Sequence, residues 1–112
     1  MQGNWIRITP VENIPPRQGR SVTLGGAELA IFNVDGRFMT IDNQCPHKGG
    51  PLCDGIVSGT TVVCPLHGWK ISLETGHVLK PNVCVRVTTY PVSVEDGVVC
   101  VEIDKCKQEN AA

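Results

Sequence analysis

Two short segments of the chain each place a cysteine and a histidine almost side by side. The first box, CPHKGG, carries Cys45 and His47, and the second box, CPLHGW, carries Cys64 and His67. Both boxes contain proline, which fixes φ, and glycine, which lets the backbone pass close to another group. If the four side chains bind one inorganic centre, the chain must fold so that two loops separated by residues 48–63 meet.

Two thiolates and two imidazoles suit either tetrahedral Zn²⁺ or a Rieske-type [2Fe–2S] cluster, in which histidines replace the cysteines on one iron. Zinc fingers usually take two cysteines from one arm and two histidines from the other, whereas here each box supplies one of each. Two loops that press on a cluster can each present a cysteine to one iron and a histidine to the other. A structural zinc site and a chance pair of similar turns are the alternatives.

The chain contains six cysteines, which raises the alternative of a disulfide scaffold. Their spacing is irregular and the start MQGNWIRITP has no signal-peptide core, so metal binding in a reducing compartment is favoured. Cys53 is interpreted as a small loop residue, since the set of four ligands is already complete. Cys84 and Cys100 lie in alternating valine runs and are predicted to pack as small apolar groups. Cys106 is predicted to be a free, exposed thiol.

The remainder of the sequence predicts β-strands joined by tight turns. Asp35-Gly36 and Asp96-Gly97 each stand between apolar runs, which is the strongest short hairpin signal. A third hairpin is expected with Ser58-Gly59 at its bend. Apolar residues at helical spacing never persist for about ten residues, as an ordinary helix requires. We therefore expect an all-β fold, an antiparallel sandwich or small barrel of about 8 to 10 strands.

The length of 112 residues suits one domain, 1–112, with a cluster-binding subdomain at about 43–82 and a frayed C-terminal tail at 105–112. With 10 Lys and Arg against 11 Asp and Glu, the net charge of −1 argues against a nucleic-acid partner. No apolar run reaches the ~20 residues of a membrane helix, so we expect a cytoplasmic protein without a membrane partner.

The spacing Cys-x-His followed by Cys-x-x-His resembles the signature of Rieske iron–sulfur proteins, and the flanking strands agree with their fold over nearly the whole chain. The segment 43–76, NQCPHKGGPLCDGIVSGTTVVCPLHGWKISLETG, is similar to the small subunit of assimilatory NAD(P)H-dependent nitrite reductase. The resemblance implies one [2Fe–2S] cluster and a third loop, containing Pro81, that covers it. The ligands that it implies are Cys45, His47, Cys64 and His67.

The chain departs from the Rieske proteins of respiratory cytochrome complexes in two ways. Those proteins resemble a pattern with two further cysteines, which form a disulfide bond between the two loops. This chain has Gly50 and Leu66 at the positions of these cysteines. The respiratory proteins also carry a serine whose hydroxyl binds a cluster sulfur, at the position of Trp69. Both differences imply a soluble, ferredoxin-like member of the family with a low reduction potential.

The resemblance implies an electron-transfer subunit of an oxidoreductase that reduces nitrite to ammonia in nitrate assimilation. The chain is not expected to be catalytic alone, because nothing in it supplies a nitrite site; its partner would be a large subunit with flavin and sirohaem. One alternative is the Rieske-type ferredoxin of an aromatic-ring dioxygenase system, placed between a flavin reductase and an oxygenase. An alternative of another class is a zinc-stabilised interaction module.

The first prediction concerns the reduction potential. Two neutral imidazoles leave the oxidised cluster without net formal charge, so it accepts an electron more easily than a four-cysteine cluster does. Rieske potentials run from about −150 to +300 mV, and loss of hydrogen bonds to sulfur lowers them. We expect a midpoint near the lower end of this range in protein-film voltammetry. A midpoint well above zero would contradict the prediction.

Overall fold

The computed structural model describes residues 4–24, 26–43, 51–65, 68–80 and 86–103. Within these ranges the chain forms eleven short strands and two 3₁₀ turns, with no α-helix. The elements are β1 Asn4–Pro10, η1 Val11–Asn13, β2 Gly19–Leu24, β3 Ala27–Val34, β4 Arg37–Asp42, η2 Leu52–Asp54, β5 Ile56–Ser58, β6 Thr61–Val63, β7 Lys70–Ser72, β8 Val78–Lys80, β9 Thr89–Tyr90, β10 Val92–Glu95 and β11 Val98–Ile103.

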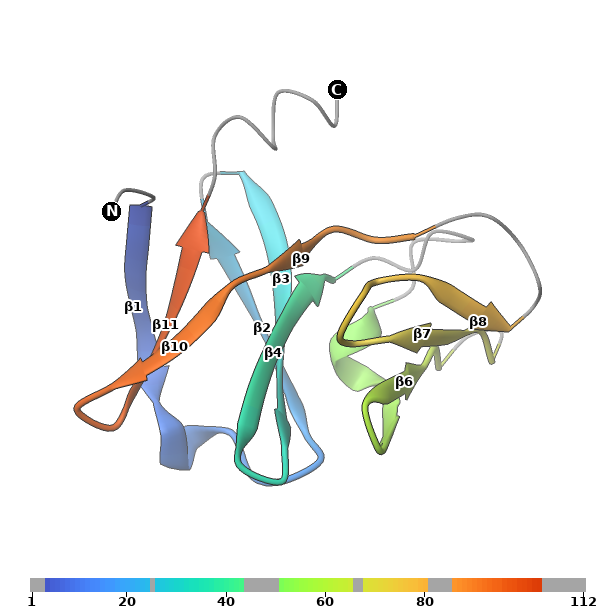
Figure 1. The fold of residues 1–112 in the computed structure, drawn as a ribbon, viewed down its shortest axis with the longest axis horizontal. Helices are drawn as coiled ribbons and strands as arrows, with labels where there is room; N and C mark the ends of the chain where they lie inside the picture. The colour runs from blue at the N-terminus through green and yellow to red at the C-terminus, as the bar shows by residue number, and fades with distance from the viewer. Residues whose placement is uncertain (1–3, 25, 44–50, 66–67, 81–85, 104–112) are drawn as a thin grey trace.

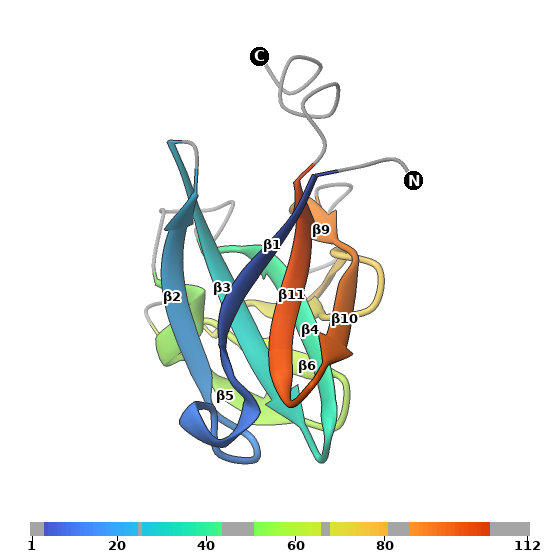
Figure 2. The ribbon, with the colours of Figure 1, turned by 90° about the vertical axis from the view of Figure 1, so that its left-hand side faces the viewer.

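The strands form three antiparallel sheets, which confirms the predicted all-β fold. The first sheet has the order β1-β11-β10, the second β2-β3-β4-β9 and the third β5-β6-β7-β8. In Figure 1 the first two sheets form the left-hand part of the molecule and the third lies to their right. Figure 2 views the molecule from the side of the first sheet, with the third sheet at the back.

Two of the three predicted hairpins have the expected turn. In the β3–β4 hairpin Val34 pairs with Arg37, and the positive φ angles of Asp35 (53°) and Gly36 (98°) suit a type I′ turn. The β10–β11 hairpin repeats this geometry at Asp96-Gly97, with φ angles of 55° and 75°. Both Asp-Gly predictions are therefore confirmed.

The third hairpin, β5–β6, bends one residue later than predicted. Ser58 pairs with Thr61, so the two loop residues are Gly59 and Thr60 rather than Ser58 and Gly59. The hydroxyl of Thr61 donates to the carbonyl oxygen of Ser58 at 2.7 Å, which keeps Ser58 in the strand. Gly59 takes the positive φ of 59° that the first loop position requires.

Strand β3 is buried on both of its faces. Ala30 and Phe32 belong to a core that packs the second sheet against the third sheet. Leu29 and Ile31 belong to a core between the first two sheets, together with Val99 and other residues. The apolar run 29–32 within β3 is typical of a strand covered from both sides. This strand therefore joins the third sheet, where the second box begins, to the rest of the molecule.

Some expectations fall on parts of the chain that the structure does not describe. The predicted tail at 105–112, Pro81 and most of the alternating segment 83–87 lie outside the described residues. Of that segment, Arg86 forms an isolated antiparallel bridge with His77. In the ranges given above, no helix is long and apolar enough to cross a membrane.

The second prediction concerns Gly76, which lies against the chain that leads into β9. Its φ is 81°, its carbonyl oxygen accepts the N–H of Val87 at 2.8 Å, and a Cβ atom there would collide with the Val87 carbonyl oxygen. Gly97 has a similar φ of 75° but open space around it. Gly97→Ala should therefore lower the free energy of unfolding only by the left-handed backbone penalty of about 1–2 kcal/mol.

Gly76→Ala should cost about 1–3 kcal/mol more than Gly97→Ala, because the alanine methyl group also overpacks the contact with Val87. Urea unfolding of both variants measures this difference in the free energy of unfolding. Equal losses in the two variants would show that the close approach of Gly76 to Val87 does not constrain the fold.

Candidate metal centre

Cys64 is the one predicted ligand that falls within the described residues. It follows β6 directly, is 2% exposed, and carries a free thiol. Its N–H donates to the carbonyl oxygen of Trp69 at 2.8 Å, and its own carbonyl oxygen accepts the N–H of Gly68 at 3.0 Å. These bonds close residues 64–69 into a short loop between β6 and β7, and the φ of +72° at Gly68 permits the turn. Cys64 is thus fixed at the base of this loop.

The first box lies between two residues that are bonded to each other. Residues 44–50, with Cys45 and His47, are outside the described residues, but both flanks of this segment are described. On the side of β4, Asn43 is 3% exposed, and its side-chain oxygen Oδ1 accepts the N–H of Cys53 at 2.7 Å. The two ends of the segment that carries the first box are therefore held together.

Asp42, the last residue of β4, directly precedes Asn43. It links this end of β4 to Thr88 and Tyr90, which lie before and in β9. Its carboxylate accepts the hydroxyl of Tyr90 at 2.8 Å and the N–H of Thr88 at 3.3 Å. Its own N–H donates to the carbonyl oxygen of Thr88 at 3.0 Å. Burial, together with the hydrogen bond to the Asp42 carboxylate, raises the pKa of Tyr90 above its ordinary value, so the phenol remains a donor.

The flank of the first box and the base of the second box lie in one hydrophobic core. Leu52, just after the first box, and Cys64 are both fully buried there with Ile41, which precedes Asp42. His67 is outside the described residues, as are Cys45 and His47, so the convergence of all four predicted ligands stays a prediction. In the described ranges no group of three His, Cys, Asp or Glu side chains could hold a metal ion.

The other described cysteines and His77 are not among the four predicted ligands, and their surroundings differ from that of Cys64. Cys53 is half-buried in η2, and burial raises the pKa of its thiol, which keeps it protonated. Cys100 is 5% exposed and packs as a small apolar group, as predicted. His77 was predicted to be a turn residue, but it pairs with Arg86 in a β-bridge directly before β8; it is exposed, and its Nδ1 lies 3.1 Å from the Thr75 hydroxyl. Cys84 and Cys106 lie outside the described residues.

Sequence patterns did not reveal the polar residues that hold the first box. The sequence predicts a strand that ends near Ile41 and a loop that follows it, and it assigns no role to the side chains of Asp42 and Asn43. The available signal was their position, because two polar residues directly before a predicted ligand loop often bind backbone N–H groups there. The partners of these residues, Glu28 and Tyr90, are distant in sequence and could not be deduced from a local pattern.

Comparison with known proteins identifies the family. Residues 4–91 match the family model of the Rieske [2Fe-2S] domain, so the chain belongs to the Rieske family. It is therefore an electron-transfer protein that binds one [2Fe–2S] cluster, which confirms the predicted cofactor over the zinc alternative. A buried, free thiol at the base of a tight loop, as at Cys64, fits the thiolate ligand that such a cluster needs. When bound, the cluster takes up and releases one electron.

Similar proteins include members from two kinds of redox system. The chain is 33% identical, over 92% of its length and 99% of the relative, to the ferredoxin component of a naphthalene 1,2-dioxygenase system from Pseudomonas aeruginosa. It superposes with a TM-score of 0.82 on the Sphingomonas yanoikuyae B1 ferredoxin, at 33% identity over 90% of this chain and 100% of that one. For a putative NADH-dependent nitrite reductase small subunit from Mycobacterium tuberculosis the TM-score is 0.83, at 26% identity over 93% and 98%.

The third prediction tests the assignment of Cys64 as a ligand, with Cys53 as the matched control. Cys64→Ala removes a thiolate that iron requires, so we expect the variant to lose most of its iron and its visible absorption after anaerobic reconstitution. Cys53→Ala should keep both close to the wild-type level, because Cys53 is not one of the four predicted ligands. Full iron content in the Cys64 variant would rule out the assignment.

Proposed function

We propose that the chain is the electron-transfer subunit of an assimilatory NAD(P)H-dependent nitrite reductase. Cys45 and Cys64 bind one iron of the cluster, and His47 and His67 bind the other. Electrons pass through this subunit within a complex whose large subunit carries flavin and sirohaem, where nitrite is reduced to ammonia. The partner assignment would place the chain in the cytoplasm.

The observation that carries this proposal is the sequence of the two boxes and the segment between them. Residues 43–76 resemble the nitrite reductase small subunit in both boxes and in the hairpin that joins them. The likeness to the Mycobacterium tuberculosis protein over 93% of this chain supports the same assignment. Neither the fold nor the cluster by itself selects the redox partner, because both are shared across the family.

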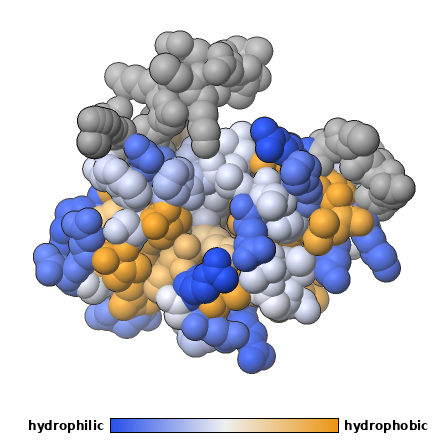
Figure 3. Space-filling view, in the orientation of Figure 1, coloured by the Kyte–Doolittle hydropathy of each residue, from blue (hydrophilic) through white to orange (hydrophobic). Residues whose placement is uncertain are grey.

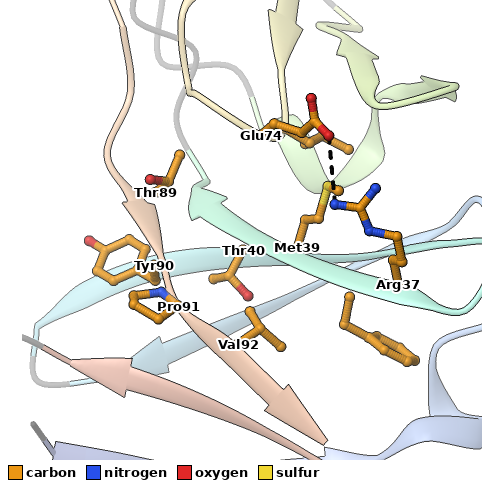
Figure 4. Close-up of a pocket in the computed structure, with 10 residues that line it drawn as sticks. Arg37, Met39, Thr40, Glu74, Thr89, Tyr90, Pro91 and Val92 are labelled. Carbon is orange, nitrogen blue, oxygen red and sulfur yellow. Dashed lines mark ion pairs between the residues drawn. The ribbon is translucent and has the colours of Figure 1, made fainter.

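One groove among the described residues also shows no arrangement for catalysis by the chain alone. A groove of about 380 Å³ lies between β4, the turn after β7, and β9–β10 (Figure 4). Its charged side chains, Arg37 and Glu74, approach each other to 3.6 Å and are largely exposed. Its one phenol, Tyr90, is already bonded to Asp42. This described lining supplies no free acid or base in a dry site where substrate could react.

The surface supports docking at short range rather than attraction over a distance. The net charge is −1, and hydrophilic and apolar side chains are interspersed over the face in Figure 3. The exposed large apolar residues among those described are also spread over several strands: Trp5, Ile56, Leu79 and Val94. Long-range steering requires a strong field of one sign, so a stable or closely fitted partner is the better match.

A second candidate function is that of the ferredoxin of an aromatic-ring dioxygenase system. The specific observation in its favour is the 33% identity to the naphthalene dioxygenase ferredoxin component, which exceeds the 26% to the nitrite reductase small subunit. The chain's own chemistry would be the same in both cases. The two functions differ in the protein that receives the electron.

The fourth prediction separates these two functions by reconstitution. The cluster-loaded chain is added to a sirohaem nitrite reductase large subunit, and nitrite-dependent oxidation of NADH and NADPH is followed. We expect oxidation to require the loaded chain and to fall to background with Cys64→Ala, since that variant cannot carry the electron. If the chain instead sustains turnover of a flavin reductase with a ring-hydroxylating oxygenase and leaves nitrite unreduced, the dioxygenase function is correct.

A further inference from the structure

Asn43 uses both ends of its side chain at the point where the first box leaves the second sheet. Its Oδ1 accepts the N–H of Cys53 at 2.7 Å, and its Nδ2 donates to the Glu28 carboxylate at 2.9 Å. Its backbone N–H also donates to the carbonyl oxygen of Glu28 at 2.9 Å. These partners fix the orientation of the amide, because an N–H must face its oxygen and a carboxylate must face its nitrogen.

The bond from Cys53 to Asn43 closes a loop. Residues 44–52, which include Cys45 and His47, lie between Asn43 and Cys53 in the sequence. A bond between the two ends lowers the conformational entropy of the segment between them. Asn43 itself is 3% exposed, whereas Glu28 is exposed and Cys53 is partly buried. Loss of the Asn43 amide therefore leaves the partly buried N–H of Cys53 without its partner.

We propose that Asn43 is a positioning residue for the cluster, which acts by fixing the two ends of the first-box loop to each other and to Glu28. Ligand groups must be held within a few tenths of an ångström to keep the geometry of a metal centre, and outer hydrogen bonds commonly provide that restraint. The inference rests on Cys45 and His47 as ligands and is independent of whether nitrite reductase is the partner.

The chain provides a matched control for this residue. Asn33 is also a buried asparagine, 8% exposed, with both ends of its side chain bonded. Its Nδ2 donates to the carbonyl oxygen of Ile14 at 2.7 Å, and its Oδ1 accepts the N–H of Gly36 at 2.8 Å. It lies at the turn of the β3–β4 hairpin, at the opposite end of β4 from Asn43 (Figure 1). Asn33→Ala therefore also removes one donated and one accepted side-chain bond of a buried asparagine, at the other end of β4.

The fifth prediction compares Asn43→Ala with Asn33→Ala in the cluster-loaded protein. Both variants should lower the melting temperature, because Asn43→Ala leaves the partly buried N–H of Cys53 unpaired and Asn33→Ala leaves the buried carbonyl oxygen of Ile14 unpaired. Only Asn43→Ala should change the electron paramagnetic resonance spectrum of the reduced cluster and its midpoint potential. It should also speed hydrogen exchange at the Cys53 amide by roughly tenfold, as expected for the loss of one buried hydrogen bond.

A double variant covers the case in which Asn43→Ala fails to retain the cluster. Asn43→Asp keeps an acceptor for the Cys53 N–H but sets a second carboxylate against Glu28, so it should also disturb the cluster. Adding Glu28→Gln supplies an amide donor to the new carboxylate and restores the net charge of the pair. We therefore expect the double variant to recover the wild-type spectrum and cluster content, and Asn43→Asp alone to lack them.

Two results would overturn the inference. One is a wild-type spectrum and potential in Asn43→Ala, with a loss of melting temperature like that of Asn33→Ala, which would leave Asn43 with a purely structural role. The other is a folded double variant that does not recover the cluster. Neither result depends on nitrite turnover, so a wrong partner assignment leaves this test intact.

Discussion

Burial of β3 on both faces is the constraint on which the rest of the structure depends. Burying a Leu, Ile or Phe side chain stabilises a fold by about 1.5–3 kcal/mol, and β3 places such residues in both cores. One core unites the first two sheets, and the other holds the third sheet against β3 and β4. Cys64 and Leu52 share the second core, so the packing that stabilises the fold also sets the base of the second box beside the flank of the first.

Hydrogen bonds complete the placement that packing begins. Packing is not directional, and it cannot set the path of a loop that has no apolar side chains to bury. At the end of β4, Asp42 binds the chain that leads into β9, and Asn43 binds η2 through Cys53 and β3 through Glu28. Two consecutive polar residues thus connect three separate parts of the chain at the root of the first box. An electron-transfer site gains from such restraint, because a rigid site changes little when the electron arrives.

Much of this could be predicted from the sequence because the signals are local. The Asp-Gly turns require positive φ, and alternation assigns faces, so two hairpins, their registers and the all-β class follow directly. The Cys/His spacing predicted the family and its cofactor. The bend at Gly59-Thr60 was missed by one residue, since a Ser-Gly and a Gly-Thr turn are nearly equivalent by composition. The roles of Asn43 and Tyr90 depend on partners up to 48 residues away, which no local pattern encodes.

The central claim is that one iron of the cluster has only sulfur ligands and the other has two imidazoles. Mössbauer spectroscopy of isotopically enriched protein tests this most directly, because it reports the ligand environment of each iron separately. We expect two distinct iron sites in equal amounts, with the added electron localised on the iron bound by nitrogen. Two equivalent sulfur-bound irons, or a protein that binds zinc and no iron, would contradict it.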